Sequence, residues 1–211
     1  MWVACLDMEG VLVPEIWVNV AESTGIAELR FTTREICDYD ELMTHRMRVL
    51  YEHGLKLSDI QRVIAKMQPY DGAVEFLAWL QERGEVLILS DTFIQFARPL
   101  ITQLGNPTIL CHSLVVKDDR IVDYQVRLSD QKRAAVRAFQ GLNYQTVAVG
   151  DSYNDLTMLR AADIGVLFRP PSQVAAEHPQ LPVRYDYESL RELIQCRMNE
   201  LQDPTAVVRS S

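Results

Sequence analysis

The sequence predicts an α/β fold in which helices cover both faces of a parallel sheet, with a small helical cap inserted after the first strand. Two observations carry this prediction. Short apolar runs that stop at polar residues alternate with helix-like stretches along most of the chain, which is the pattern of a parallel sheet with crossover helices. The alternation breaks between residues 14 and 69, where helical patterns replace it.

The first apolar run covers residues 2–6 and ends abruptly at Asp7, which predicts a buried strand that delivers an acid at its carboxyl end. Two later runs end in the same way. They are Val86–Leu89 before Ser90-Asp91 and Thr146–Val149 before Gly150-Asp151, with helix-like stretches at 73–83 and 130–140 in front of them. Because ligands bind beyond the carboxyl ends of parallel strands, we expect these polar strand ends to form one site.

Residues 15–69 are expected to form the cap. Helical patterns occur at 16–24, 40–53 and 57–67. The segment leaves the core after the Asp7 loop and returns near Pro69, so we expect it to close over the site. Residues 1–14 and 70–202 would then form the catalytic core, and the tail 203–211 lacks periodicity and is expected to fray.

A β-hairpin is predicted between the second and third runs. Apolar stretches at 113–116 and 121–126 flank the polar residues 117–120, which is typical of two antiparallel strands with a polar turn. We expect its role to be structural.

The composition argues against several classes of partner. The formal net charge is -8 and no run of Lys and Arg is present, so we expect no nucleic-acid partner. The chain has no apolar run of about 20 residues and no basic leader, so we expect no membrane association and a cytoplasmic location. The oligomeric state stays open, with a homodimer as one option. Four cysteines without metal-ligand spacing are expected to be free buried thiols: Cys5, Cys37, Cys111 and Cys196.

Acidic residues gather in two of the loops that follow strands. Asp7 and Glu9 lie two residues apart after the first strand, and Asp151 and Asp155 lie in the Gly-led loop 150–155. A strand-end Asp alone can equally cap a turn. Four acids in one crevice repel one another unless a cation neutralises them, and oxygen ligands favour Mg²⁺, whereas the absence of nearby His or Cys disfavours zinc.

Two further residues add groups that bind phosphate. Lys132 opens the helix before the third run, and Ser90 lies at the end of the second. A single Lys near a helix start is usually solvated and a single Ser is usually a cap. Lys132 and Ser90 indicate a phosphate site only because they are expected at the same edge of the sheet as the acids.

In this order, the motifs resemble those of the haloacid dehalogenase superfamily: the Asp7 loop, Ser90, Lys132, and then the loop 150–155. The resemblance covers residues 3 to about 170 and implies a Rossmann-like core. The cap position is similar to that of the phosphoserine phosphatase branch. The stretches 7–15, 39–50 and 90–92 further resemble a bacterial subgroup that also passes the phosphoryl group to homoserine.

The resemblance implies roles for the acids. Asp7 would be the nucleophile that forms an aspartyl-phosphate, and Glu9 the general acid and base. Asp7, the backbone carbonyl of Glu9 and Asp151 would hold the magnesium ion, with Asp155 positioning these groups from behind. Most of the superfamily carries Asp where this chain has Glu9, although Glu matches the transferase subgroup.

The resemblance also implies phosphoryl contacts. Lys132 would be catalytic and hold phosphoryl oxygens, and Ser90 and Asn154 would contact phosphate or substrate. Asp91 and Thr92, which follow Ser90, are assigned to the substrate site on the same resemblance.

The cap would select the amino acid. Arg46 is expected to bind the substrate carboxylate, because a guanidinium forms two parallel hydrogen bonds with a carboxylate, and Glu15 to meet the ammonium group. The expected donor is phosphoserine, and homoserine, one methylene longer than serine, is the expected acceptor beside water.

Two alternatives remain open on the sequence. The donor could be another small phosphate ester, although a sugar has no charges for Arg46 and Glu15 to meet. The chain could instead be a non-catalytic binding module on the same fold. The presence of Asp7, Lys132 and Asp151 together argues against the second alternative.

Overall fold

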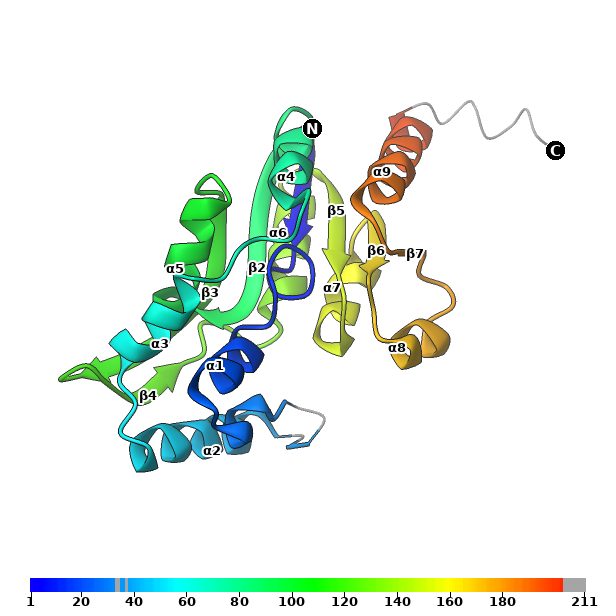
Figure 1. The fold of residues 1–211 in the computed structure, drawn as a ribbon. Helices are drawn as coiled ribbons and strands as arrows, with labels where there is room; N and C mark the ends of the chain where they lie inside the picture. The colour runs from blue at the N-terminus through cyan, green and yellow to red at the C-terminus, as the bar shows by residue number, and fades with distance from the viewer. Residues whose placement is uncertain (33–34, 37, 203–211) are drawn as a thin grey trace.

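A seven-stranded sheet runs through the centre of the described part of the protein (Figure 1). The computed structural model describes residues 1–32, 35–36 and 38–202. The strands are β1 (Trp2–Leu6), β2 (Glu85–Phe93), β3 (Thr108–Lys117), β4 (Arg120–Gln125), β5 (Gln145–Gly150), β6 (Ile164–Phe168) and β7 (Val183–Arg184). Their order is β4-β3-β2-β1-β5-β6-β7, and every neighbouring pair is parallel except β3 and β4. The predicted parallel α/β sheet is therefore confirmed, with one antiparallel edge strand.

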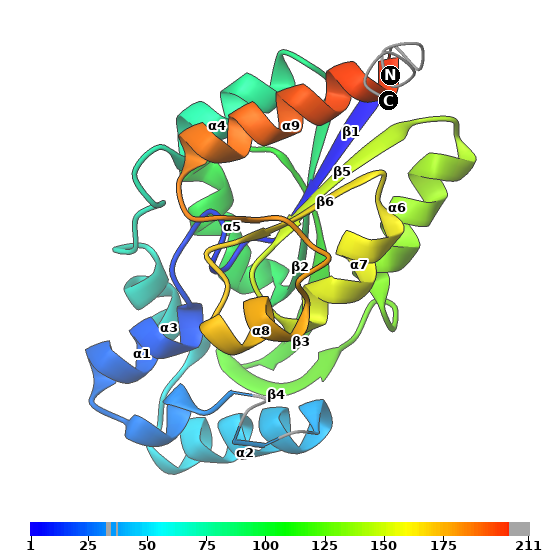
Figure 2. The same cartoon turned by 90° about the vertical axis from the view of Figure 1, so that its right-hand side faces the viewer.

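Helices cover both faces of this sheet (Figure 2). The α-helices are α1 (Ile16–Thr24), α2 (Tyr39–Glu52), α3 (Leu57–Ile64), α4 (Ala73–Gln81), α5 (Ile94–Gln103), α6 (Gln131–Gly141), α7 (Leu156–Ala161), α8 (Ser172–Glu177) and α9 (Tyr187–Gln202), and the 3₁₀ helices are η1 (Ala27–Arg30) and η2 (Tyr153–Asp155). On one face α4, α5 and α9 pack against the strands, and on the other face α6 and α7 do so. The sheet and the helices on its two faces therefore form three layers.

The first strand shows why the sequence adopts this arrangement. Successive side chains of a strand point to opposite faces of the sheet. Ala4 and Leu6 lie in the apolar cluster under α4, α5 and α9, whereas Val3 and Cys5 lie in the cluster under α6 and α7. All four are almost completely buried. A strand that is covered on both sides must be apolar at every position, as this one is.

The helices between residues 16 and 64 lie beyond the carboxyl ends of the central strands (Figure 1). Local polar groups start two of them. Asp38 accepts a hydrogen bond from the amide of Glu41 at 2.8 Å at the start of α2, and Asp59 accepts one from the amide of Lys56 at 2.9 Å at the start of α3. The three expected helices are present, and α3 ends earlier than expected, at Ile64. The division at residues 15 and 69 into core and cap stays a prediction.

The predicted hairpin is present, but its first strand is longer than expected. β3 begins at Thr108 and pairs in parallel with β2 before its second half pairs with β4. The turn contacts α3, because Asp119 accepts hydrogen bonds from the amide and hydroxyl of Ser58 at 3.0 and 2.6 Å. The hydroxyl of Tyr124 on β4 donates to Asp40 of α2. The hairpin therefore supports the helical segment as well as extending the sheet.

The cysteine prediction was partly wrong. Cys5, Cys111 and Cys196 are free thiols, as expected, but only Cys5 is buried; Cys111 is half-buried and Cys196 is exposed. Cys196 lies on the outer side of α9, where its neighbours are polar. Cys37 and the predicted frayed tail 203–211 fall outside the described residues.

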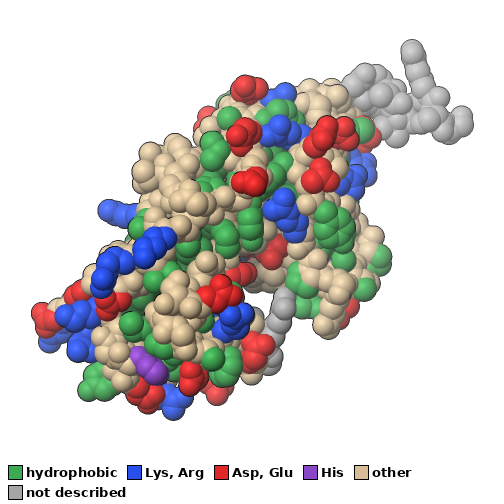
Figure 3. All heavy atoms as spheres, viewed as in Figure 1, with side chains coloured by type: hydrophobic (Ala, Val, Ile, Leu, Met, Phe, Trp, Pro, Cys, Tyr) green, Lys and Arg blue, Asp and Glu red, His purple; other side chains and the backbone are tan. Residues whose placement is uncertain are grey.

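Acidic and basic side chains are interspersed on the face seen in Figure 3. Within the described ranges, none of the helices combines the length and the apolar character needed to cross a membrane.

Candidate active site

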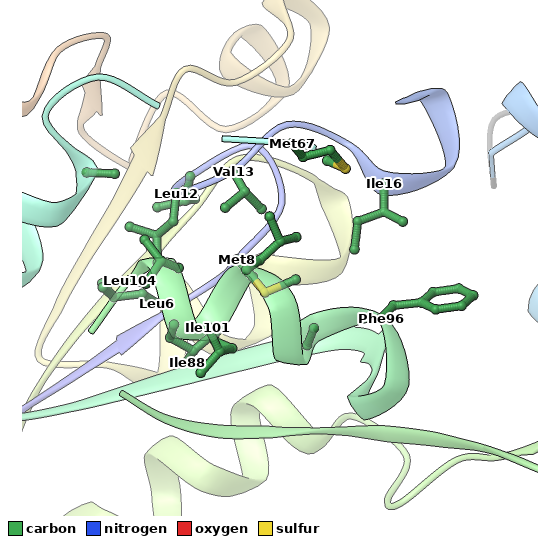
Figure 4. Close-up of a cluster of buried hydrophobic side chains, with 14 of the residues drawn as sticks. Leu6, Met8, Leu12, Val13, Ile16, Met67, Ile88, Phe96, Ile101 and Leu104 are labelled. Atoms are coloured by element: carbon green, nitrogen blue, oxygen red, sulfur yellow. The ribbon is translucent and has the colours of Figure 1, made fainter. Parts of the chain in front are cut away.

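The loop that follows β1 is fixed by a hydrogen bond to β5 and by burial in the apolar core. The amide of Asp7 donates to the carbonyl of Val149 on β5 at 2.9 Å, and the Asp7 side chain is 7% exposed. The next residue, Met8, is fully buried and lies in the apolar cluster with Leu12 and Ile16 (Figure 4). Burying Met8 holds Asp7 and Glu9 on either side of it.

The loops after β1 and β5 are in direct contact. Gly10 has a φ of 77°, a left-handed conformation that glycine adopts without strain. A Cβ atom built on Gly10 would collide with the carboxylate of Asp151. Glycine at this position therefore allows the two acidic loops to approach each other.

A buried ammonium group joins the two loops. Lys132 Nζ lies 2.9 Å from Asp7 Oδ1 and 2.7 Å from Asp155 Oδ1, and the lysine side chain is 2% exposed. Burial alone would lower the pKa of Lys132, but the carboxylates of Asp155 and Asp7 raise it well above its ordinary value. Lys132 is therefore a permanent positive charge between the first and last acidic loops.

Asp155 organises the second loop. Its Oδ2 accepts hydrogen bonds from the amides of Asp151 and Ser152 at 2.9 and 3.2 Å, while Oδ1 accepts from Lys132. Asp155 is completely buried. Both of its oxygens are thus engaged by protein groups, and the positioning role of Asp155 stays a prediction.

Asp7, Asp151 and Asp155 form a carboxylate cluster that can hold a metal ion. One oxygen from each lies within 4.8 Å of the other two. Burial, and then the neighbouring Asp155, raise the pKa of Asp151 to about 7. The same two causes raise the pKa of Asp7 well above its usual range, against the effect of Lys132. The positive charge of the surrounding protein groups is therefore too small to balance these carboxylates. Because all the candidate ligand atoms are oxygens, the cluster suits a hard divalent cation.

The side chain of Glu9, from the loop after β1, reaches the start of α1. Its Oε2 accepts a hydrogen bond from the amide of Ile16 at 2.8 Å. Burial, followed by the neighbouring carboxylate of Glu15, raises the pKa of Glu9 to about 8. At neutral pH, Glu9 therefore retains a proton that it can donate.

The end of β2 is irregular where the polar residues occur. The pairing of β2 with β3 shifts between Leu89 and Phe93, a change of register that frees intervening residues from the ladder. Ser90 is 2% exposed, and its Oγ accepts a hydrogen bond from the amide of Thr92 at 3.3 Å. Thr92 is buried as well.

Asp91, between Ser90 and Thr92, connects to the loop after β5. Its Oδ2 accepts a hydrogen bond from Asn154 Nδ2 at 2.9 Å and lies 3.6 Å from Lys132 Nζ. Asn154 itself is exposed. The structure therefore brings Asp91 and Asn154 next to Lys132, which itself contacts the carboxylate cluster.

Arg46 extends from α2 and is buried, at 7% exposure. Its guanidinium lies 4.6 Å from the centre of the Trp17 ring, and Nη2 donates to the carbonyl of Phe31 at 2.8 Å. Its Nε is buried without a hydrogen-bond partner. Burial lowers the pKa of Arg46 to about 10, with opposing effects from Glu9 and other neighbours. Arg46, Glu9 and Glu15 therefore form a second group of ionisable side chains, on the side of the helical segment.

Some residues of the site escaped prediction. Gln131, which is buried beside Lys132, donates to the carbonyl of Ser90 at 2.8 Å and to Asp91 at 3.1 Å. His112 on β3 lies 3.6 Å from Asp91. In the sequence, the only feature that could have pointed to Gln131 as a site residue is its position next to Lys132. No local sequence feature points to His112.

Comparison with known proteins agrees with this geometry. A family model described as haloacid dehalogenase-like hydrolase matches residues 3–163. A protein named phosphoserine phosphatase ThrH from Pseudomonas aeruginosa is 58% identical over 90% of this chain and 94% of its own length. A phosphoserine phosphatase from Pseudomonas syringae pv. tomato is 56% identical over 94% of this chain and 85% of its own. A solved structure described as a phospho-aspartyl intermediate analogue of phosphoserine phosphatase shares the fold, with a TM-score of 0.73 and 20% identity over 92% of this chain and 97% of that one.

Proposed function

Since the chain belongs to the haloacid dehalogenase-like hydrolase family, we propose that it is a magnesium-dependent phosphoserine phosphatase that works through an aspartyl-phosphate on Asp7. The main support is the contact of Lys132 with Asp7 at 2.9 Å inside a carboxylate cluster. A nucleophile, a phosphate-binding cation and metal-ligating oxygens then share one crevice. The two Pseudomonas relatives carry the name phosphoserine phosphatase.

Magnesium would be held by Asp7, Asp151 and the backbone carbonyl of Glu9. Asp155 is less suited to ligate, because its two oxygens already accept hydrogen bonds from Lys132 and from backbone amides. When bound, the ion would neutralise the carboxylates and polarise the phosphoryl oxygens.

Asp7 supplies the nucleophile. Its carboxylate attacks the phosphorus of phosphoserine, an Asp7–phosphorus bond forms, and the bond from phosphorus to the serine oxygen breaks. Glu9 gives its proton to that leaving oxygen, which is consistent with a pKa raised to about 8. In the second step an incoming hydroxyl attacks the phosphorus, Glu9 takes the proton of that hydroxyl, and the Asp7 carboxylate is released.

Lys132 and Ser90 are proposed to hold the phosphoryl oxygens, with Asn154 as a further donor. Lys132 stays protonated because it lies among carboxylates, so it can offset charge on the transferred group. Ser90 Oγ accepts a hydrogen bond from Thr92, which leaves its own hydroxyl proton free to donate. A contact between the Thr92 side chain and the substrate stays a prediction.

Arg46 and Glu15 are proposed to select the amino-acid part of the substrate. Arg46 Nε is a buried donor without a partner, and a buried polar group of this kind is costly unless something binds it. The carboxylate of phosphoserine would satisfy this donor. The exposed Glu15, close enough to Glu9 to raise its pKa, would meet the ammonium group.

We further propose that the phosphorylated Asp7 can pass its phosphoryl group to homoserine. Serine leaves the pocket before the second step, and homoserine is only one methylene longer. One methylene changes binding by about 1 to 3 kcal/mol. A bound hydroxyl can also compete with water through an effective molarity of about 10⁵ M or more. The cytoplasmic location and the homodimer stay predictions.

Phosphate release from L-phosphoserine tests the proposal directly. The assay contains magnesium, with or without L-homoserine, and mass spectrometry follows O-phosphohomoserine. We expect free phosphate without homoserine and phosphohomoserine with it, and loss of both products in Asp7→Asn, which keeps the shape of the side chain. Free phosphate alone would leave a plain phosphatase, and no turnover of phosphoserine would exclude it as the donor. Wild-type activity in Asp7→Asn would remove Asp7 as the nucleophile.

A further inference from the structure

One charged side chain beside the proposed phosphoryl pocket, Asp91, has no role in the chemistry of the aspartyl-phosphate. Its Oδ2 lies 2.9 Å from Asn154 Nδ2 and 3.6 Å from Lys132 Nζ, so it contacts two groups that are proposed to bind phosphate. Its side chain is 34% exposed. A carboxylate cannot donate a hydrogen bond to a phosphoryl oxygen unless it is protonated.

Two buried side chains, Gln131 and His112, lie next to the carboxylate of Asp91. Gln131 Nε2 donates to Asp91 Oδ1 at 3.1 Å, and Gln131 is itself held by the side chain of Arg127 at 3.1 Å. His112 Nδ1 accepts a hydrogen bond from the amide of Arg127 at 3.2 Å. This leaves the ring proton of neutral His112 on Nε2, which faces Asp91 Oδ1 at 3.6 Å. The carboxylate is thus held by donors on both of its oxygens.

These partners keep Asp91 ionised. Burial alone would raise the pKa of Asp91, but Lys132 and the hydrogen bonds from Asn154 and Gln131 bring it below its ordinary value. Asp91 is therefore a fixed negative charge at neutral pH.

The charge of the pocket depends on this residue. Lys132 faces Asp7, Asp155 and Asp91, and Asp151 belongs to the same crevice. When all four acids are ionised, the lysine and one divalent cation together leave one negative charge in excess. Without the carboxylate of Asp91 the charges would balance.

We propose that Asp91 is a binding-site residue whose negative charge weakens the binding of free phosphate and so promotes product release. The inference rests on the function proposed above. Both phosphoserine and inorganic phosphate meet this repulsion, but phosphoserine gains further contacts through its carboxylate and ammonium groups, at Arg46 and Glu15. Inorganic phosphate has no such groups, so Asp91 favours its release after the reaction.

Titration calorimetry with inorganic phosphate tests this inference on the magnesium-loaded full chain. The variants are Asp91→Asn, which keeps the size of the side chain, and Asp91→Ser, which removes most of it. Asp123→Asn is the matched control, because it makes the same charge change on the exposed edge strand β4. At a mildly alkaline pH, where phosphate is a dianion, we expect both Asp91 variants to bind phosphate at least about fivefold more tightly than wild type. The gain should shrink at high salt, and the control should bind as wild type does.

The opposite role makes the opposite prediction. If Asp91 only holds Asn154 and Lys132 in place, Asp91→Ser would bind phosphate more weakly, and this result, or unchanged affinity in both variants, would overturn the inference. Turnover of phosphoserine by the wild-type protein is measured in parallel. Turnover with equal phosphate affinities would reject the inference and leave the proposed function intact. Absence of both turnover and phosphate binding in every variant would reject the two together.

Discussion

Lys132 Nζ lies 2.9 Å from Asp7 Oδ1, and both side chains are withdrawn from solvent, at 2% and 7% exposure. The two residues belong to the first and third motifs of the sequence pattern, and the fold brings them together. A buried charge depends strongly on its partner, since removing one member leaves the other without compensation. This relationship makes Lys132 important for both stability and catalysis.

Lys132→Met should therefore lose measurable turnover of phosphoserine and destabilise the protein by about 3 kcal/mol. The methionine fills a similar volume but leaves Asp7 and Asp155 without their cation. Urea unfolding measures the stability and phosphate release the activity. Arg133→Met on the same helix, at an exposed position, is the control and should change both by little. An inactive Lys132→Met of unchanged stability would contradict the structural part of this account.

Arg46→Ala should impair phosphoserine much more than an ester without a carboxylate. We expect kcat/KM to fall by about 100-fold for phosphoserine and by far less for p-nitrophenyl phosphate, because only phosphoserine offers a partner to the guanidinium. Arg48→Ala, two residues along α2 at an exposed position, controls for general damage to the helix. Equal losses on both esters would remove Arg46 from the substrate site.

The pH dependence of the reaction should report Glu9. Its pKa is raised to about 8 by burial and by Glu15, and ester cleavage needs its protonated form. We therefore expect kcat/KM for phosphoserine to decline above about pH 8. In Glu9→Gln, turnover should be strongly reduced and this limb of the pH profile should disappear. A profile with the same alkaline decline in the variant would assign it to another group.

Metal-free protein should become less stable as the pH rises from about 4 to about 7. Asp151 has a folded-state pKa near 7, well above the value near 3.9 of an unfolded Asp. Between these values the unfolded chain has lost the proton that the folded chain still binds, so rising pH favours unfolding. Thermal melts in EDTA across this range measure the trend. Magnesium should raise the melting temperature most at the upper end, because it favours the ionised carboxylates, and Asp151→Asn should weaken both effects.

The parts of the fold that follow from local pattern could be predicted from the sequence. The strand β1 and its acid Asp7 are visible because a strand buried on both faces must be apolar until it ends. The helices α1 and α2 are visible from their periodicity. Helix α9 was missed, and with it the exposure of Cys196, although Leu190, Ile194 and Met198 recur every four residues and form the buried side of this helix. Cys196 lies off that apolar stripe.

The network around Asp91 could not be predicted in the same way. The resemblance to a family placed Asp91 in the substrate site, but its charge has meaning only through the partners that surround it. Gln131 and His112 reach it from a helix and a strand that are distant in the sequence. Contacts of this kind depend on how the strands are ordered and on a shift of register in β2, which no local pattern encodes.

The closeness of Gly10 to Asp151 has a consequence for protein engineering. The loops that carry the first and the last acids occupy one shared space, so neither can be exchanged for a bulkier homologous loop by itself. A chimaera that takes the Asp7 loop from a relative must take the loop that matches residues 150–155 from the same parent. Recombination libraries made from this family should therefore show these two short segments inherited together among their active members.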